Sequence, residues 1–130
     1  MDGRIRKVTW NLFRSMHDVA DWFWQQRDNR VGEVEEPIDC PLANYLKETR
    51  PGLNDVSVGD VYTTYENSKG ETVRVENPKW VGKFVRRIDM VCGKYVPYDD
   101  AYYDGDEYFV GDVTGEEALE VLKEVTNNRV

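Results

Sequence analysis

The chain has 130 residues, of which 40% are hydrophobic and 32% charged, and its formal net charge is −8. This composition is typical of a soluble globular protein and excludes a fibre or a disordered tail. We expect one cytosolic domain over residues 1–130, because the sequence has neither the run of about 20 apolar residues that crosses a bilayer nor the apolar stretch of a signal peptide.

The first predicted helix covers residues 9–26, with Thr9 as its N-cap. Apolar residues recur along one face at helical spacing: Leu12, Phe13, Met16, Val19, Ala20, Phe23 and Trp24. Trp22 falls off this face, where it either covers a neighbouring loop or anchors a partner. Residues 27–39 are mostly polar and acidic and predict a connector.

A short second helix is predicted to begin at Pro41, which suits the first helical position because its missing N–H has no helical partner there. A strand region follows, in which Val56 and Val58 alternate with polar residues. The segments on either side of the polar loop 66–70 then predict a β-hairpin.

The third predicted helix has Asn77 as its cap, Pro78 at its first position and Gly93 at its end. Its inward face is apolar and should pack against the first helix: Trp80, Val81, Phe84, Val85, Ile88 and Val91. Its outward face is basic: Lys79, Lys83, Arg86 and Arg87. This basic face is a solvated surface, a phosphate-binding stripe or a partner for the acidic segment of the same chain.

The C-terminal part of the chain predicts a second hairpin and a last helix. Asp104-Gly105 is a strong signal for a two-residue turn, because both central residues of a type I′ turn need positive φ. Thr114 and Glu117 form a capping box that opens the helix. Taken together, these elements predict an α+β fold with amphipathic helices packed on short antiparallel β-hairpins.

The acidic charge is concentrated in residues 95–125, which hold ten acidic residues and one lysine, while the rest of the chain carries a net charge of +1. Within this stretch, the segment from Tyr95 to Asp112 is also rich in tyrosine, a residue that gives contact area at low entropic cost. We expect eight of its residues to bind a partner: Asp99, Asp100, Tyr102, Tyr103, Asp104, Asp106, Glu107 and Tyr108. The alternative is that the tyrosines fill the core and the carboxylates only face solvent.

Other chemistry has weaker signals. An EF-hand loop that starts at Asp100 lacks acidic ligands at its third and twelfth positions, which are Tyr102 and Gly111. Two cysteines and one histidine are too few for a disulfide scaffold or a Cys/His zinc site. Cys40 precedes a helix, whose dipole would lower the pKa of a thiol, but a buried free thiol is the simpler expectation for it and for Cys92.

Three parts of the sequence resemble a pattern in small bacterial and phage proteins: Asp39-Cys40-Pro41-Leu42-Ala43-Asn44-Tyr45-Leu46 with Val58-Gly59 downstream, the segment from Trp80 to Asp89, and Thr114 to Ala118. The resemblance implies no activity and no catalytic residues. The acidic, tyrosine-rich segment is not part of the shared pattern, so it is individual to this protein.

Our main hypothesis is a non-enzymatic module that docks its acidic hairpin on a basic partner protein. One form of this hypothesis is an inhibitor from a phage or mobile element. Such an inhibitor would occupy the nucleic-acid-binding groove of its partner, as anti-CRISPR proteins and other nucleic-acid mimics do. We expect no cofactor, no direct binding of nucleic acid and no membrane association. Two alternatives stay open: a small enzyme or metal-binding protein that uses the carboxylates of residues 99–112, and a structural or housekeeping protein whose acidity only gives solubility.

Overall fold

The computed structural model describes residues 6–8, 12–98 and 105–130. Its elements in chain order are β1 (Arg6–Val8), α1 (Met16–Gln25), β2 (Arg30–Glu33), α2 (Pro41–Thr49), β3 (Asn54–Val58), β4 (Tyr62–Glu66), β5 (Thr72–Glu76), α3 (Lys79–Cys92), β6 (Lys94–Pro97), β7 (Glu107–Val110), β8 (Asp112–Thr114) and α4 (Gly115–Val125). The protein therefore has the α+β fold that the sequence predicts.

The largest sheet has the strand order β1-β5-β4-β3. Its β4–β5 hairpin confirms the hairpin prediction, and its register places Thr63 opposite Val75 and Tyr65 opposite Val73, all four of them buried. Strand β1 runs parallel to β5, whereas β3 is antiparallel to β4. Two separate antiparallel ribbons are formed by β2 with β8 and by β6 with β7.

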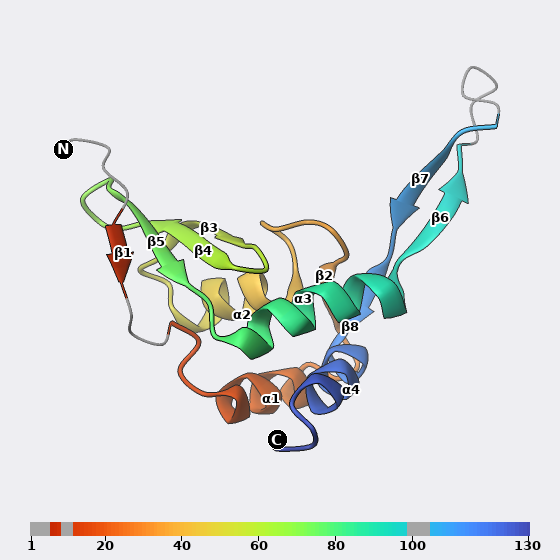
Figure 1. Cartoon of the computed structure of the whole chain (residues 1–130), viewed down its shortest axis with the longest axis horizontal. Coiled ribbons are helices and arrows are strands. Elements are labelled where there is room, and N and C mark those ends of the chain that lie inside the picture. The colour runs from red at the N-terminus through yellow and green to blue at the C-terminus, as the bar shows by residue number, and fades with distance from the viewer. Residues whose placement is uncertain (1–5, 9–11, 99–104) are drawn as a thin grey trace.

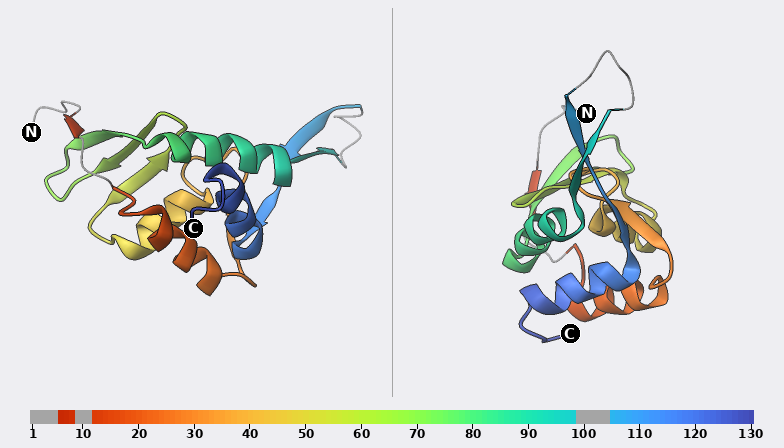
Figure 2. Two further views of the ribbon diagram at one scale, coloured as in Figure 1. Left: turned by 60° about the horizontal axis from the view of Figure 1, so that its bottom comes forward. Right: turned by 90° about the vertical axis from the view of Figure 1, so that its right-hand side faces the viewer.

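The helices enclose the core between themselves and this sheet (Figures 1 and 2). Helix α2 packs against β3, and α4 packs against both α1 and α3. Figure 2 shows α1 and α4 side by side on the side of the molecule away from the sheet. Phe84 of α3 is 1% exposed and stacks on Phe23 of α1 with ring centroids 5.6 Å apart, which confirms that the two apolar stripes meet.

Helix α1 begins at Met16 and not at the predicted residue 9. Arg14 has a φ of 65°, a left-handed conformation that an α-helix cannot continue through. Ser15 caps the helix instead, because its side chain accepts a hydrogen bond from the N–H of Asp18 and the Asp18 carboxylate bonds back to Ser15. The predicted cap, Thr9, lies outside the described residues.

The two tryptophans of α1 exchange the roles that periodicity predicts. Trp22 is only 7% exposed and meets Tyr45 of α2 edge to face, with ring centroids 5.8 Å apart. Trp24 is 57% exposed, and the guanidinium of Arg27 lies 4.3 Å above its ring. The prediction was wrong because α2 covers a side of α1 that the pattern assigned to solvent.

Three further local predictions need correction. The predicted connector contains strand β2, which pairs with β8 near the other end of the chain. Asn77 does not cap α3, because its side chain bonds the Thr63 hydroxyl and the Gly59 carbonyl, and Pro78 is the N-cap residue. Val91, predicted to face inward, is 50% exposed near the end of α3.

Candidate functional site

The β6–β7 ribbon extends away from the rest of the protein, as Figure 1 shows. We call residues 94–98 and 105–110 the arm. One residue, Gly93, separates the end of α3 from β6, and one residue, Gly111, separates β7 from β8. The arm therefore joins the helical core without a flexible linker on either side.

Two aromatic pairs brace the arm, one on each face. Tyr95 lies directly opposite Phe109, with ring centroids 4.9 Å apart. Tyr98 packs diagonally on Tyr108 across the ribbon, with ring centroids 4.7 Å apart. Alternate residues of a strand point to opposite faces, so the two pairs lie on opposite sides. An isolated two-stranded hairpin is marginally stable, and cross-strand aromatic pairs are what stabilises it.

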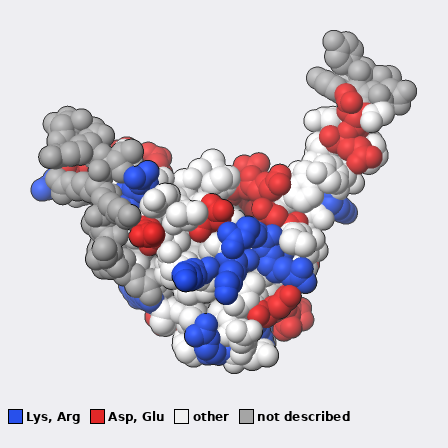
Figure 3. All heavy atoms as spheres, viewed as in Figure 1, with Lys and Arg blue, Asp and Glu red and all other residues white. Residues whose placement is uncertain are grey.

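The arm exposes aromatic and acidic side chains together. Tyr95 is 68% exposed, Tyr98 42% and Tyr108 39%, so these tyrosines do not fill the core. Asp106 and Glu107 are exposed beside them, and Figure 3 shows acidic atoms on the outer part of the arm. Among the described residues, five of the eight exposed large hydrophobic side chains belong to residues 90–108, so apolar exposure is concentrated at the arm and the helix end before it.

Close packing at two glycines sets the direction of the arm. A Cβ on Gly111 would lie 2.1 Å from the carbonyl oxygen of Cys92, and a Cβ on Gly93 would lie 2.1 Å from the ring of Phe109. No larger residue fits either position without moving backbone or a packed ring. In addition, the N–H of Val34 donates to the carbonyl of Gly111 at 2.9 Å, which ties the base of the arm to the segment after β2.

Arg30 anchors the strand that follows the arm. Its guanidinium bonds Asp112 of β8 and Asp39 before α2, each at 2.9 Å. The hydrogen bond from Arg30, and then that from Asn44, lowers the pKa of the Asp39 carboxyl, and both carboxylates raise the pKa of Arg30. This ion-pair cluster is structural, because it joins β2, β8 and the start of α2 at the base of the arm.

The structure places three of the eight predicted binding residues, and brings them together: Asp106, Glu107 and Tyr108 are exposed neighbours on the arm. The other five lie outside the described residues: Asp99, Asp100, Tyr102, Tyr103 and Asp104.

The predicted two-residue turn at Asp104-Gly105 lies partly outside the described residues, because Asp104 is not among them. Next to it, the N–H of Tyr98 donates to the carbonyl of Asp106 at 3.3 Å. The predicted set also omitted Tyr95 and Tyr98. Their signal was the high tyrosine content of the segment from Tyr95 to Asp112, in which both residues lie.

The remaining candidates are less open to partners. Burial raises the pKa of the Cys40 and Cys92 thiols to about 11, so desolvation outweighs the helix dipole that would have activated Cys40. On the basic face of α3, Arg86 pairs with Asp60 at 3.6 Å and Arg87 with Glu124 at 3.1 Å. Half of that stripe is thus already paired within the chain.

Within the described part of the chain, no three His, Cys, Asp or Glu side chains come close enough to share a metal ion. None of the described helices combines the length and the apolar character that crossing a membrane requires. Comparisons with protein-family models, with curated proteins and with solved structures found no match to this chain.

Proposed function

We propose that this protein is a non-enzymatic binding module that docks its arm on a basic surface of a partner protein. The observation that carries the proposal is the exposure of Tyr95, Tyr98 and Tyr108 next to Asp106 and Glu107 on a protruding ribbon. Tyrosine is enriched in protein interfaces because its ring buries a large area and its hydroxyl tolerates water.

The two residue types have separate roles in this proposal. Carboxylates at the rim of the contact attract a basic partner over a distance and raise the association rate, an effect that salt screens. Tyrosine rings that become buried at the centre of the contact slow dissociation. Because the arm is joined to the core without a linker, little conformational entropy is lost when it docks.

By analogy with nucleic-acid mimics, we propose that the basic surface is a groove that binds nucleic acid. A ribbon that carries carboxylates resembles a phosphate backbone to a basic groove, as in anti-CRISPR proteins and other nucleic-acid mimics. In this form the protein is a cytoplasmic inhibitor from a phage or mobile element, and its partner uses the same groove for nucleic acid. The acidic arm itself would repel nucleic acid, so direct binding of DNA or RNA is not part of the proposal.

The test compares three forms of the full chain as bait in extracts of the natural host. The arm variant is Asp106→Lys/Glu107→Lys. Its matched control is Asp21→Lys/Glu48→Lys, which makes the same change in net charge at exposed positions on α1 and α2. The proposal expects a basic protein to be recovered by the parent and the control and lost by the arm variant.

The recovered protein is then purified, and its association and dissociation rates are measured at two salt concentrations. The arm variant should lower the association rate by about tenfold or more at low salt. Tyr108→Ala should mainly raise the dissociation rate. Equal recovery of the same partners by the parent and the arm variant would refute docking through the arm and favour acidity that serves only solubility.

A further inference from the structure

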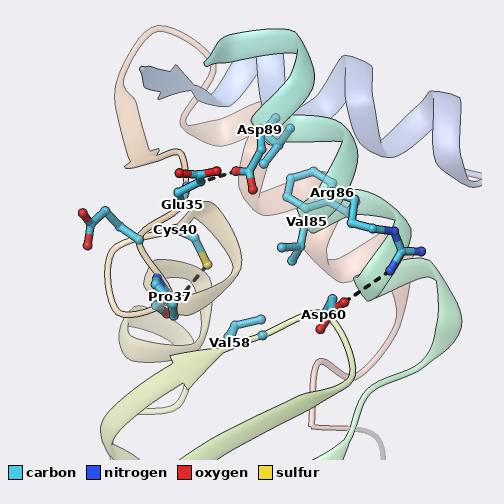
Figure 4. Close-up of a pocket in the computed structure, with 12 residues that line it drawn as sticks. Glu35, Pro37, Cys40, Val58, Asp60, Val85, Arg86 and Asp89 are labelled. Atoms are coloured by element: carbon cyan, nitrogen blue, oxygen red, sulfur yellow. Dashed lines mark hydrogen bonds and ion pairs between the residues drawn. The ribbon is translucent and has the colours of Figure 1, made fainter. Parts of the chain in front are cut away.

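A pocket lies between α3, the loop that precedes α2 and the end of β3 (Figure 4). Its volume is about 430 Å³, which lies within the range of roughly 300–1,000 Å³ found for small-molecule sites. The buried side chains that line it are apolar: Cys40, Val58, Phe84 and Ile88. None of the arm residues lines this pocket, so it is separate from the proposed docking site.

Hydrogen bonds hold the walls of the pocket in place. The N–H of Val58 donates to the carbonyl of Pro37 at 2.9 Å, which joins β3 to the loop. On the other side, the N–H of Glu35 donates to a carboxylate oxygen of Asp89 on α3 at 3.0 Å. Glu35 has a φ of 55°, a left-handed conformation that is uncommon for a residue other than glycine. The pocket is thus formed before any ligand arrives.

The charge of the lining is mostly negative. Four carboxylates line the pocket, those of Glu35, Glu36, Asp60 and Asp89, against the single guanidinium of Arg86. Arg86 is paired with Asp60 at 3.6 Å, and Figure 4 shows it turned toward Asp60. Asp60 therefore already neutralises the Arg86 guanidinium. The other carboxylates of the lining, those of Glu35, Glu36 and Asp89, favour a cation.

Asp89 is a partly buried carboxylate of the lining. Figure 4 shows the Asp89 side chain reaching from α3 toward the opposite loop, above Val85 and Val58. Among the described residues, the only hydrogen bond to the Asp89 carboxylate comes from the Glu35 N–H. Burial raises the pKa of Asp89 because one neutral donor does not replace the lost hydration. A positively charged hydrogen-bond donor in the pocket would compensate the Asp89 carboxylate for its lost hydration.

We propose that this pocket binds a small organic cation, with its ammonium group at the Asp89 carboxylate and its apolar stem against Val58, Val85 and Cys40. The buried apolar lining favours this ligand over a hydrated inorganic ion, because apolar side chains provide no oxygen ligands for such an ion. The carboxylate distinguishes it from a neutral molecule of the same shape, which would leave the charge of Asp89 uncompensated.

The test is a titration of the ¹⁵N-labelled full chain at neutral pH, followed by backbone amide chemical shifts. The probes are phenethylamine, the neutral isostere 2-phenylethanol, methylamine without an apolar stem, and a capped lysine (Nα-acetyl-lysine methylamide). Phenethylamine should give saturable shifts at the amides of Glu35, Val58 and Asp89. The alcohol and methylamine should each bind about tenfold more weakly or worse.

Two variants localise the cation. Asp89→Asn keeps an acceptor for the Glu35 N–H, preserves the size of the side chain and should weaken phenethylamine by about tenfold or more. Asp21→Asn removes one carboxylate from the exposed part of α1 and should change the affinity by less than about twofold.

Three results would overturn the proposal: equal binding of the amine and the alcohol, parent-like binding by Asp89→Asn, and tighter binding of the capped lysine, which would place the cation on a protein partner. The comparison of amine and alcohol uses the parent chain, so it decides the matter even if Asp89→Asn does not fold. Loss of docking through the arm would leave all of these measurements unchanged.

Discussion

Trp22 and Trp24 give the sharpest test of the packing, because periodicity and tertiary structure assign them opposite roles. Trp22 is 7% exposed and contacts both Phe23 and Tyr45, with ring centroids 5.8 Å apart in each pair. Truncation of a buried tryptophan to alanine costs about 3–5 kcal/mol. Among the described residues, no acceptor reaches the buried indole N–H of Trp22, and removal of this single neutral donor returns about 1 kcal/mol. We therefore expect Trp22→Ala to lower the free energy of unfolding by about 2–4 kcal/mol.

Trp24→Ala should cost less than about 1 kcal/mol. Its side chain is 57% exposed, and its main specific contact is the guanidinium of Arg27, a cation–π pair worth about 0.5–1 kcal/mol at an exposed site. A third variant, Trp22→Phe, fills most of the space without the unpaired donor and should stay within about 1 kcal/mol of the parent.

Urea unfolding followed by far-UV circular dichroism measures all three variants, and thermal unfolding should show a fall in Tm of roughly 10 °C for Trp22→Ala. A loss of stability in Trp24→Ala as large as that in Trp22→Ala would contradict the burial of Trp22, because α1 would then present to the core the face that periodicity alone predicts.

Three further predictions concern α3 and the two thiols. Phe84→Ala should lower the free energy of unfolding by about 3–5 kcal/mol, because Phe84 is 1% exposed. Val91 lies seven residues later on the same predicted face but is exposed, so Val91→Ala should change that free energy by no more than about 0.5 kcal/mol. Similar losses in the two variants would contradict the exposure of Val91. Burial raises the pKa of Asp89 above its ordinary value of 3.8, so the folded protein binds that proton more tightly than the unfolded chain. The parent should therefore lose stability relative to Asp89→Asn as the pH rises through the range just above 3.8. A stability difference between these two proteins that does not change with pH in urea titrations would rule out this shift. Burial raises the pKa of the Cys40 and Cys92 thiols to about 11. At pH 8 both should therefore react with iodoacetamide roughly 100-fold more slowly than a thiol of pKa 9.0. Mass spectrometry should find rapid labelling of the two cysteines only after denaturation.

Features that depend on neighbouring residues were predictable from the sequence. The capping box of Thr114 and Glu117 opens α4 where the pattern places it, and Pro41 occupies the first turn of α2. The β4–β5 hairpin follows from alternating residues around a polar loop. These signals act over a few residues, where steric preference and local hydrogen bonds decide the conformation.

The arm was predictable from the sequence only in part, because its exposure depends on contacts between segments that are distant in the chain. Composition located the acidic, tyrosine-rich segment, but the exposure of Tyr95 and Tyr108 depends on whether another layer covers the ribbon. Alternation of residues along a strand is the same for a covered and an uncovered hairpin, so no pattern in the chain distinguishes the two.

The α+β class, most of the helices and the place where negative charge gathers can be predicted from the amino-acid sequence alone. The burial of Trp22 beneath α2, the pairing of β2 with β8 and the position of Asp89 at a preformed pocket depend on how the chain packs as a whole. Each of these features depends on segments that are distant in the chain; Arg30 and Asp112, for example, bond across 82 positions. Such contacts form when the whole chain buries its apolar surface, and the free energy of that burial belongs to the assembled core and not to any one segment.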